Sequence, residues 1–301
     1  MLLDCPTPLR RPAAPGKTSP MNILSIQSWV ATGHVGNASA MFPLQRLGAE
    51  VWAIHTVQFS NHPGHGAFTG QVYDGASVRA LVDGIEAQGL LPQCDAVLSG
   101  YMGDPGIVAA VLDAVRRVRA ANPDALYCCD PVIGDVGPGV YVQPGIPALM
   151  RGASQDADVL TPNQFELEYL SGRPIRTEAD TLAAIGGMPM RPRGTILVTS
   201  LSTDRTPADT IDMVAAGPDG AWRLRTPKLP IQANGAGDAV AALFLFHLLR
   251  TKDARASLEA AGSAIHGLLR RTFEAGAREL LTVAAQEEFV RPRDWFRAVP
   301  L

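Results

Sequence analysis

Short apolar runs and longer helix-like segments alternate along most of this chain. The longer segments repeat apolar residues at intervals of three and four positions, as an amphipathic helix does. Predicted strands lie at residues 22–26, 51–59, 95–99, 126–130, 159–160 and 195–199, and predicted helices at 36–47, 105–121 and 163–170. This alternation predicts an α/β protein whose mostly parallel sheet is covered by helices on both faces.

The pattern changes after the last of these strands. Residues 211–215 and 222–225 flank a turn rich in glycine, proline and aspartate, which predicts an antiparallel hairpin at the sheet edge. Residues 253–271 are amphipathic and predict a helix, with Arg270 and Arg271 on its solvated face. The rest of the chain, to its end, is expected to form packing helices and a tail.

The domain organisation is expected to be simple. Residues 1–20 contain five prolines and few apolar residues, so they predict a disordered tail. The rest, residues 21–301, is expected to form a single domain, because a chain with 47% hydrophobic residues can bury one large core.

Composition and charge exclude several classes of partner. The net charge is -3 and the basic residues are scattered, so we expect no nucleic-acid partner and no membrane partner. No apolar run approaches the roughly 20 residues of a spanning helix. The four cysteines have no CxxC spacing, and the adjacent Cys128 and Cys129 would point to opposite faces of a strand. We therefore expect a soluble protein of the reducing cytoplasm.

A glycine-rich turn, residues 234–238, runs directly into an apolar helix-like block. Gly235 and Gly237 let backbone N–H groups converge, and the following helix adds its free N–H groups, which together favour an anion. Asp238 would repel phosphate unless it had a role there, such as taking a proton from an attacking hydroxyl. The alternative is an ordinary aspartate at the start of a helix.

A second candidate site follows the strand that ends near residue 130. Asp130 and Asp135 lie in a loop with several glycines, and carboxylates at a strand end are suited to Mg²⁺. The alternative is a pair of solvated loop aspartates.

The spacing of Asn163 and Glu166 has two interpretations. Glu166 lies three positions after Asn163, which is the spacing of a helix capping box. The same two side chains could share a cation or a phosphate, and the spacing does not separate these possibilities.

Residues 59–66 form a polar, glycine-containing loop. This loop is interpreted either as a substrate loop or as a surface hairpin built from turn residues.

These segments together resemble the pyridoxal kinases of the ribokinase-like superfamily. The matching segments are residues 26–28 (IQS), 33–37 (GHVGN), 57–62 (VQFSNH), 97–101 (VLSGY), 130–132 (DPV), 161–166 (TPNQFE) and 235–238 (GAGD). The last motif belongs to the whole superfamily, whereas IQS and VQFSNH are specific to the pyridoxal branch. The resemblance implies a three-layer αβα sandwich and an enzyme that uses ATP to phosphorylate the 5′-hydroxyl of pyridoxal, and also of pyridoxine and pyridoxamine.

The resemblance also assigns roles to residues. Asp238 would be the catalytic base, and the turn of Gly235, Ala236 and Gly237 would hold the developing charge. Ser28 would bind the pyridine ring. The remaining substrate-binding residues would be Val35, Val57, Phe59, His62, Pro63, Gly64, His65 and Tyr101.

The implied nucleotide site lies at the other strand ends. ATP would be bound by Asp130, Thr161, Asn163, Glu166, Thr199, Ser200, Asn234, Gly235 and Gly237. Mg²⁺ would be held by Asp135 with Glu166, Asp130 and Thr161. The resemblance further implies a possible monovalent cation such as K⁺ and a homodimer.

The chain departs from the family pattern at three places, one of which is Ala236, where relatives have threonine or valine. Pro63 and His65 stand where many relatives have threonine and tyrosine, and Thr199 stands where some bacterial relatives have lysine. The alternatives are a hydroxymethylpyrimidine kinase or another ribokinase-like small-molecule kinase, and a non-catalytic carrier of pyridoxal 5′-phosphate. A dinucleotide-binding dehydrogenase is disfavoured because no GxGxxG motif follows the first strand.

Overall fold

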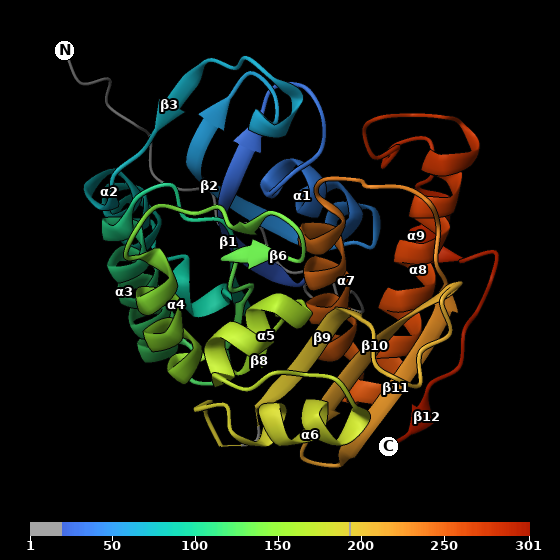
Figure 1. Ribbon diagram of the computed structural model, residues 1–301. Helices are drawn as coiled ribbons and strands as arrows, with labels where there is room; N and C mark the ends of the chain where they lie inside the picture. The colour runs from blue at the N-terminus through green and yellow to red at the C-terminus, as the bar shows by residue number, and fades with distance from the viewer. Residues whose placement is uncertain (1–19, 193) are drawn as a thin grey trace, which may run out of the picture.

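A mixed ten-stranded sheet runs through the computed structural model, which describes residues 20–192 and 194–301 (Figure 1). The strand order is β12-β11-β10-β9-β8-β5-β4-β1-β2-β3. The strands are β1 (Asn22–Val30), β2 (Glu50–Phe59), β3 (Gly70–Val72), β4 (Ala96–Ser99), β5 (Leu126–Cys129), β8 (Val159–Leu160), β9 (Thr195–Leu201), β10 (Thr210–Gly217), β11 (Gly220–Pro227) and β12 (Val299–Pro300).

The middle of the sheet is parallel and both edges are antiparallel. Strands β9, β8, β5, β4, β1 and β2 pair in parallel, while β3 pairs antiparallel with β2, and β10, β11 and β12 extend the other edge in antiparallel pairs. The chain adds β2 on one side of β1 and then β4 on the other. Ligands of such sheets bind at the carboxyl ends of the strands near this reversal.

Helices cover both faces of the sheet, which confirms the predicted three-layer sandwich. One face carries α2 (Gly75–Ala87), α3 (Pro105–Ala121), α4 (Ile146–Ala153), α5 (Gln164–Ser171) and α6 (Glu178–Gly186). The other carries α1 (Asn37–Arg46), α7 (Ala236–Thr251), α8 (Ala254–Glu274) and α9 (Glu287–Val290). Two separate hydrophobic clusters fill the layers, and the adjacent Cys128 and Cys129 belong to different clusters, as predicted.

Local sequence explains the ends of the helices. Asp104 caps α3, where its carboxylate accepts a hydrogen bond of 2.8 Å from the N–H of Gly106, and Pro105 occupies the first helical position. The apolar positions of α3 recur every three or four residues and face the core. None of the helices in the described parts of the chain has the length and apolar content needed to cross a membrane.

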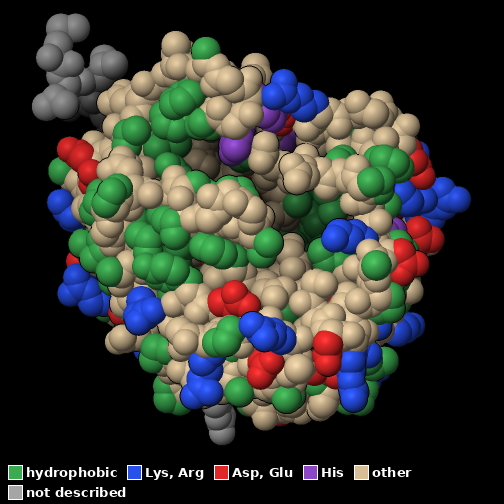
Figure 2. Space-filling view, viewed as in Figure 1, with side chains coloured by type: hydrophobic (Ala, Val, Ile, Leu, Met, Phe, Trp, Pro, Cys, Tyr) green, Lys and Arg blue, Asp and Glu red, His purple; other side chains and the backbone are tan. Residues whose placement is uncertain are grey.

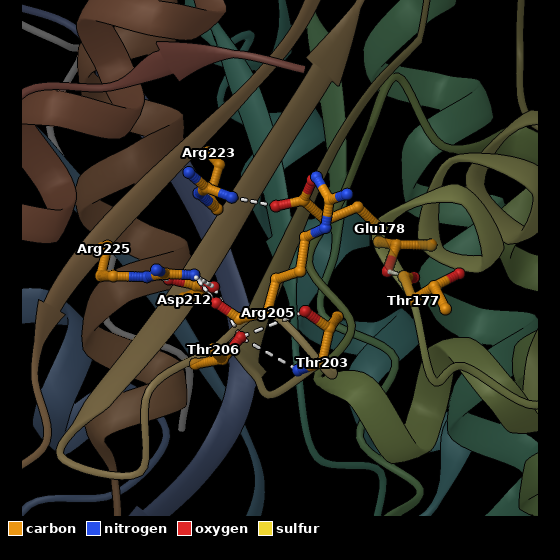
Figure 3. Close-up of polar contacts among 9 residues, drawn as sticks. Thr177, Glu178, Thr203, Arg205, Thr206, Asp212, Arg223 and Arg225 are labelled. Atoms are coloured by element: carbon orange, nitrogen blue, oxygen red, sulfur yellow. Dashed lines mark hydrogen bonds and ion pairs between the residues drawn. The ribbon is translucent and has the colours of Figure 1, made fainter.

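The predicted edge hairpin is confirmed as β10 and β11, and buried charge holds it in place. Arg225 on β11 donates two hydrogen bonds, both of 2.7 Å, to the carboxylate of Asp212, which is fully buried on β10 (Figure 3). Thr206, in the loop after β9, donates to the same carboxylate at 2.8 Å. A second ion pair joins Arg223 to Glu178 at the start of α6. The hairpin is thus tied to the loop that follows β9 and to a covering helix.

The C-terminal part differs from the sequence-based expectation. Instead of a tail, the last residues form β12, which pairs with β11, and Ala298 is buried. Arg270 does not lie on a solvated face, because its side chain is 14% exposed and pairs with Glu288 at 3.1 Å, whereas Arg271 is exposed as predicted. The tail predicted for residues 1–20 lies, except for residue 20, outside the described residues.

Candidate active site

Helix α7 begins after a turn whose backbone conformation requires glycine. Gly235 precedes the helix with a φ of 88°, and a Cβ at this position would lie 1.8 Å from the carbonyl oxygen of His34. The hydroxyl of Ser39 donates to the carbonyl of Gly235 at 2.7 Å. In the described part of the chain, the residue that precedes α7 is Gly235, which has no side chain to cap the first N–H groups of the helix. These N–H groups are therefore available to an anion.

The carboxylate of Asp238 lies in the first turn of α7. Its Oδ2 accepts a hydrogen bond of 2.8 Å from the N–H of Gly36, which is 202 residues away in the chain. The side chain keeps some accessible surface although protein atoms surround it. Burial raises its pKa to about 6, and the Gly36 donor opposes part of this shift. A carboxylate with this pKa can accept a proton near neutral pH.

Gly36 connects the candidate base with the predicted ring-binding residue. It has a φ of 54°, and a Cβ there would lie 2.3 Å from both the carbonyl oxygen and the hydroxyl of Ser28. The same residue donates its N–H to Asp238. Ser28 and Asp238 therefore both lie directly beside Gly36. Gly36 belongs to a motif noted in the sequence, but no role was predicted for it.

Asp130, Thr161 and Glu166 come together at the ends of β5 and β8. The hydroxyl of Thr161 donates to Asp130 at 3.2 Å, and all three side chains are buried. Burial and the negative charges of Glu166 and Asp238 raise the pKa of Asp130 well above its usual range. The structure thus brings these three predicted residues together, and their roles toward the nucleotide and its cation stay predictions.

The capping box predicted at the start of α5 is present. Glu166 and Asn163 exchange two hydrogen bonds of 2.9 Å through their side chains and backbone N–H groups. Glu166 also accepts from the N–H of Ile133 at 2.9 Å. Burial raises the pKa of Glu166 although these N–H donors lower it. Capping thus accounts for the spacing, and a role toward a cation stays a prediction.

The chemistry of this cluster suits a divalent cation. No lysine or arginine in the described part of the chain pairs with Asp130, Glu166 or Asp238. Asp135, on the short strand β6 (Gly134–Asp135), has an exposed side chain, and its charge also raises the pKa of Glu166. No group of three or more potential ligands is close enough to form a complete metal site within the described ranges. Hard oxygen ligands with few protein partners are typical of Mg²⁺ sites that also use phosphate and water.

The end of β9 has a strained backbone beside this cluster. Ser200 adopts a φ of 53°, which is rare for a residue other than glycine and is concentrated at functional sites. Thr199 pairs with Asn163 in an isolated parallel bridge, and Asn163 donates to the carbonyl of Gly134 at 2.8 Å. Three predicted nucleotide-binding residues therefore meet at neighbouring strand ends.

The predicted walls of the ring site differ in exposure. Val35 and Val57 are buried, whereas Phe59 and Tyr101 keep accessible surface. Phe59 lies on a cavity of about 510 Å³ that is also lined by Ala31, Gln58, Ser60, Thr69, Gly70, Gln71 and Tyr73. This cavity lies along the β2–β3 hairpin, and of the predicted site residues only Phe59 lines it. The contact between these side chains and a substrate stays a prediction.

The loop at residues 62–66 is part of a hairpin, yet His65 is turned inward. Pro63, Gly64 and Gly66 are exposed, as the surface-hairpin interpretation predicts. The His65 side chain is only 14% exposed and pairs with Glu279 at 2.8 Å. Figure 2 shows histidine side chains at the upper edge of a hollow in the middle of this face. Nothing in the sequence pattern singles out Glu279.

Comparison with known proteins identifies the family. The chain belongs to the family described as phosphomethylpyrimidine kinase, which matches residues 78–282. Pyridoxal kinase PdxY of Granulibacter bethesdensis is 59% identical over 283 residues, which cover 92% of this chain and 99% of the relative. The Deinococcus radiodurans protein of the same name is 56% identical over 289 residues, with 93% and 97% covered. Within the family, this chain therefore belongs to the pyridoxal kinases, as the sequence motifs predict.

Solved structures agree with this assignment. Pyridoxal kinase from Leishmania donovani in complex with ADP and pyridoxine superimposes with a TM-score of 0.85 at 28% identity, covering 93% of this chain and 99% of that chain. The same enzyme with ADP and ginkgotoxin gives a TM-score of 0.86 at 29% identity, with the same coverage. The ribokinase-like fold is thus confirmed.

Proposed function

We propose that this protein is a pyridoxal kinase, which transfers the γ-phosphoryl group of ATP to the 5′-hydroxyl of pyridoxal and also accepts pyridoxine and pyridoxamine. The observation that carries the proposal is the carboxylate of Asp238, whose raised pKa suits a base and which lies in the first turn of α7, beside its N-terminal N–H groups. A base next to an anion site is what hydroxyl phosphorylation needs.

In this mechanism Asp238 acts on the substrate hydroxyl that accepts the phosphoryl group. Its carboxylate takes the proton of the 5′-hydroxyl as the new oxygen–phosphorus bond forms, and the bond to the leaving ADP breaks. The free N–H groups at the start of α7 stabilise negative charge on the transferred phosphoryl group. Ser28, which like the base lies beside Gly36, orients the ring.

The nucleotide lies along the ends of β5, β8 and β9 in this proposal. Asp130, Asp135, Glu166 and Thr161 are the residues that would hold Mg²⁺, with Asn163, Thr199 and Ser200 along the phosphates. Mg²⁺, when bound, neutralises phosphate charge. A monovalent cation such as K⁺, a homodimer and a cytoplasmic location remain part of the proposal.

A second candidate substrate is hydroxymethylpyrimidine, a relative of the phosphomethylpyrimidine that the family description names. Both substrates are aromatic rings with a primary hydroxyl, so a common base would serve either. Ser28 and residues 57–62, which match the pyridoxal branch, favour pyridoxal.

A coupled assay of ADP release tests the function. The purified protein with ATP and Mg²⁺ should give its highest kcat/KM with one of pyridoxal, pyridoxine and pyridoxamine, well above that with hydroxymethylpyrimidine. The reverse order would establish the second candidate. Tight binding of pyridoxal 5′-phosphate without any turnover would instead indicate a carrier.

A further inference from the structure

A carboxylate from the C-terminal part of the chain reaches the rim of the active site. Glu279 lies in the loop between α8 and α9, and its Oε1 is 2.8 Å from Nδ1 of His65. The side chains are 32% and 14% exposed, so this contact is more enclosed than a typical surface ion pair.

The loop after β1 makes room for this carboxylate. Gly33 has a φ of 92°, and a Cβ there would lie 2.4 Å from Oε2 of Glu279. Any larger residue would displace the glutamate. Three loops that are distant in the sequence, those after β1, β2 and α8, therefore meet at Glu279.

The opposite edge of the His65 ring faces the anion-binding turn. Its Nε2 lies 3.2 Å from Nδ2 of Asn234, the residue directly before Gly235. Because Nδ1 faces a carboxylate, Nδ1 carries the hydrogen, and in the neutral ring Nε2 then accepts a hydrogen bond from the amide of Asn234. Glu279 thus determines which way the imidazole presents its acceptor.

The neighbouring imidazole rings of His62 and His34 do not compete with His65 for the carboxylate of Glu279. His62 packs edge-on against His65 at a centroid distance of 5.6 Å, and its Nδ1 accepts from the N–H of Gly64 at 3.1 Å. Burial lowers the pKa of both His62 and His34, which favours their neutral forms at neutral pH. Glu279 therefore has His65 as its direct partner in this cluster.

We propose that Glu279 is a positioning residue of the kinase: through His65 it fixes Asn234 at the start of the anion-binding turn and holds the loop of residues 62–66 against that turn. The inference rests on the proposed kinase function. A displacement of about 1 Å at reacting groups can cost on the order of a hundredfold in rate, so a residue that never touches substrate can control turnover.

Steady-state kinetics on a small set of variants test the proposal. Glu279→Ala should lower kcat/KM for pyridoxal by roughly tenfold to a hundredfold. Glu279→Gln keeps an oxygen that accepts from Nδ1 of His65 and should recover most of the activity. His65→Ala should resemble Glu279→Ala, and adding Glu279→Ala to His65→Ala should change nothing further, because both act through one contact.

Glu287→Ala is the matched control. Glu287 pairs with Arg46 at 2.7 Å in the same C-terminal region, but it lies away from the anion-binding turn and 73% of its side chain is exposed. If Glu279→Ala costs no more activity than Glu287→Ala, or if its effect persists in full in the His65→Ala background, the proposal is wrong.

Hydrogen exchange separates this inference from the kinase function itself. The hydrogen-bonded amides of residues 64–66 in the loop and of Ala239 at the start of α7 should exchange faster in Glu279→Ala than in wild type, and not in Glu287→Ala. This readout needs no turnover, so it remains decisive even if the wild-type protein phosphorylates none of the vitamers. Unchanged exchange in both segments overturns the positioning role.

Discussion

A single carboxylate, that of Asp238, combines a raised pKa with a fixed position. Replacing Asp238 with Asn keeps the shape but removes the base, so kcat should fall by roughly 10² to 10⁴ while KM changes little. Steady-state assays with pyridoxal measure both constants. Near-normal turnover in the variant would exclude Asp238 as the base.

The same substitution should make the protein more stable. A folded-state pKa of about 6, above the usual value of 3.8, means that the native state binds more protons than the unfolded state between these values. Stability contributed by Asp238 is therefore present at low pH and lost as pH rises toward 6. At pH 7 the Asp238→Asn variant should melt at a higher temperature than wild type, which calorimetry can measure. A lower melting temperature would mean that the carboxylate has a structural role.

The pH dependence of catalysis follows from the same pKa. Asp238 must be ionised to accept a proton, so kcat/KM for pyridoxal should rise with pH up to about 6 and then level off. Below that pH it should fall about tenfold per unit, as expected for loss of one essential base. A profile without an acid limb near pH 6 contradicts this assignment.

At the scale of elements, variants of Glu166 and Asp135 distinguish a role in stabilising the fold from a role in binding a cation. Glu166→Ala leaves the N–H groups of Ile133 and Asn163 without their acceptor, so the free energy of unfolding should fall by about 1–3 kcal/mol. Asp135→Ala removes an exposed carboxylate and should raise the Mg²⁺ concentration needed for half-maximal activity without changing stability. Thermal melts and Mg²⁺ titrations of both variants decide. An unchanged Mg²⁺ requirement in Asp135→Ala removes it from the cation site.

The edge hairpin depends on one buried ion pair. Arg225→Ala leaves the fully buried carboxylate of Asp212 without its positive partner, so the free energy of unfolding should fall by about 3 kcal/mol. A double variant with Asp212→Ala should recover part of this loss, because the uncompensated charge is gone. Denaturant unfolding of the single and double variants measures the effect. A loss below about 1 kcal/mol would show that solvent compensates Asp212 as at a surface pair.

The elements that sequence predicts best are those with a buried, regular face. Helix α3 has the predicted bounds Pro105–Ala121, and β2 differs from the prediction by one residue. By contrast, Gly70–Val72 of β3 is exposed throughout, so it has no apolar pattern, and β12 is only two residues long. Such edge strands form because a neighbouring strand offers free backbone groups, which no local pattern records.

At the scale of the whole molecule, Glu259 on α8 fastens the end of the chain. It accepts hydrogen bonds from the N–H of Ala298 at 3.1 Å and from Arg297 at 2.9 Å. Burial opposes ionisation of Glu259, yet these donors prevail and lower its pKa. Its stabilising effect is therefore present above pH 4.5 and lost as pH falls. Melting temperatures from pH 3 to 7 should fall less steeply toward acid in Glu259→Ala than in wild type; parallel curves would contradict this.

The site shows where sequence-based prediction stops. Local motifs locate Asp238, Asp130 and the capping pair, because their spacing is short and their chemistry specific. The contact of Asp238 with Gly36 and that of His65 with Glu279 depend on how distant loops meet in three dimensions. The strain at Ser200 is equally invisible, since serine shows no preference for a positive φ.

The start of α7, where no side chain of Gly235 caps the helix, gives the phosphoryl group of the substrate a structural role as well as a chemical one. The first N–H groups of every helix lack a partner within the helix, and at α7 the preceding Gly235 has no side chain to supply one. In the proposed reaction the phosphoryl group supplies the missing acceptor and serves as a temporary N-cap. Each turnover would then supply this acceptor to an already formed helical turn and remove it again when product departs.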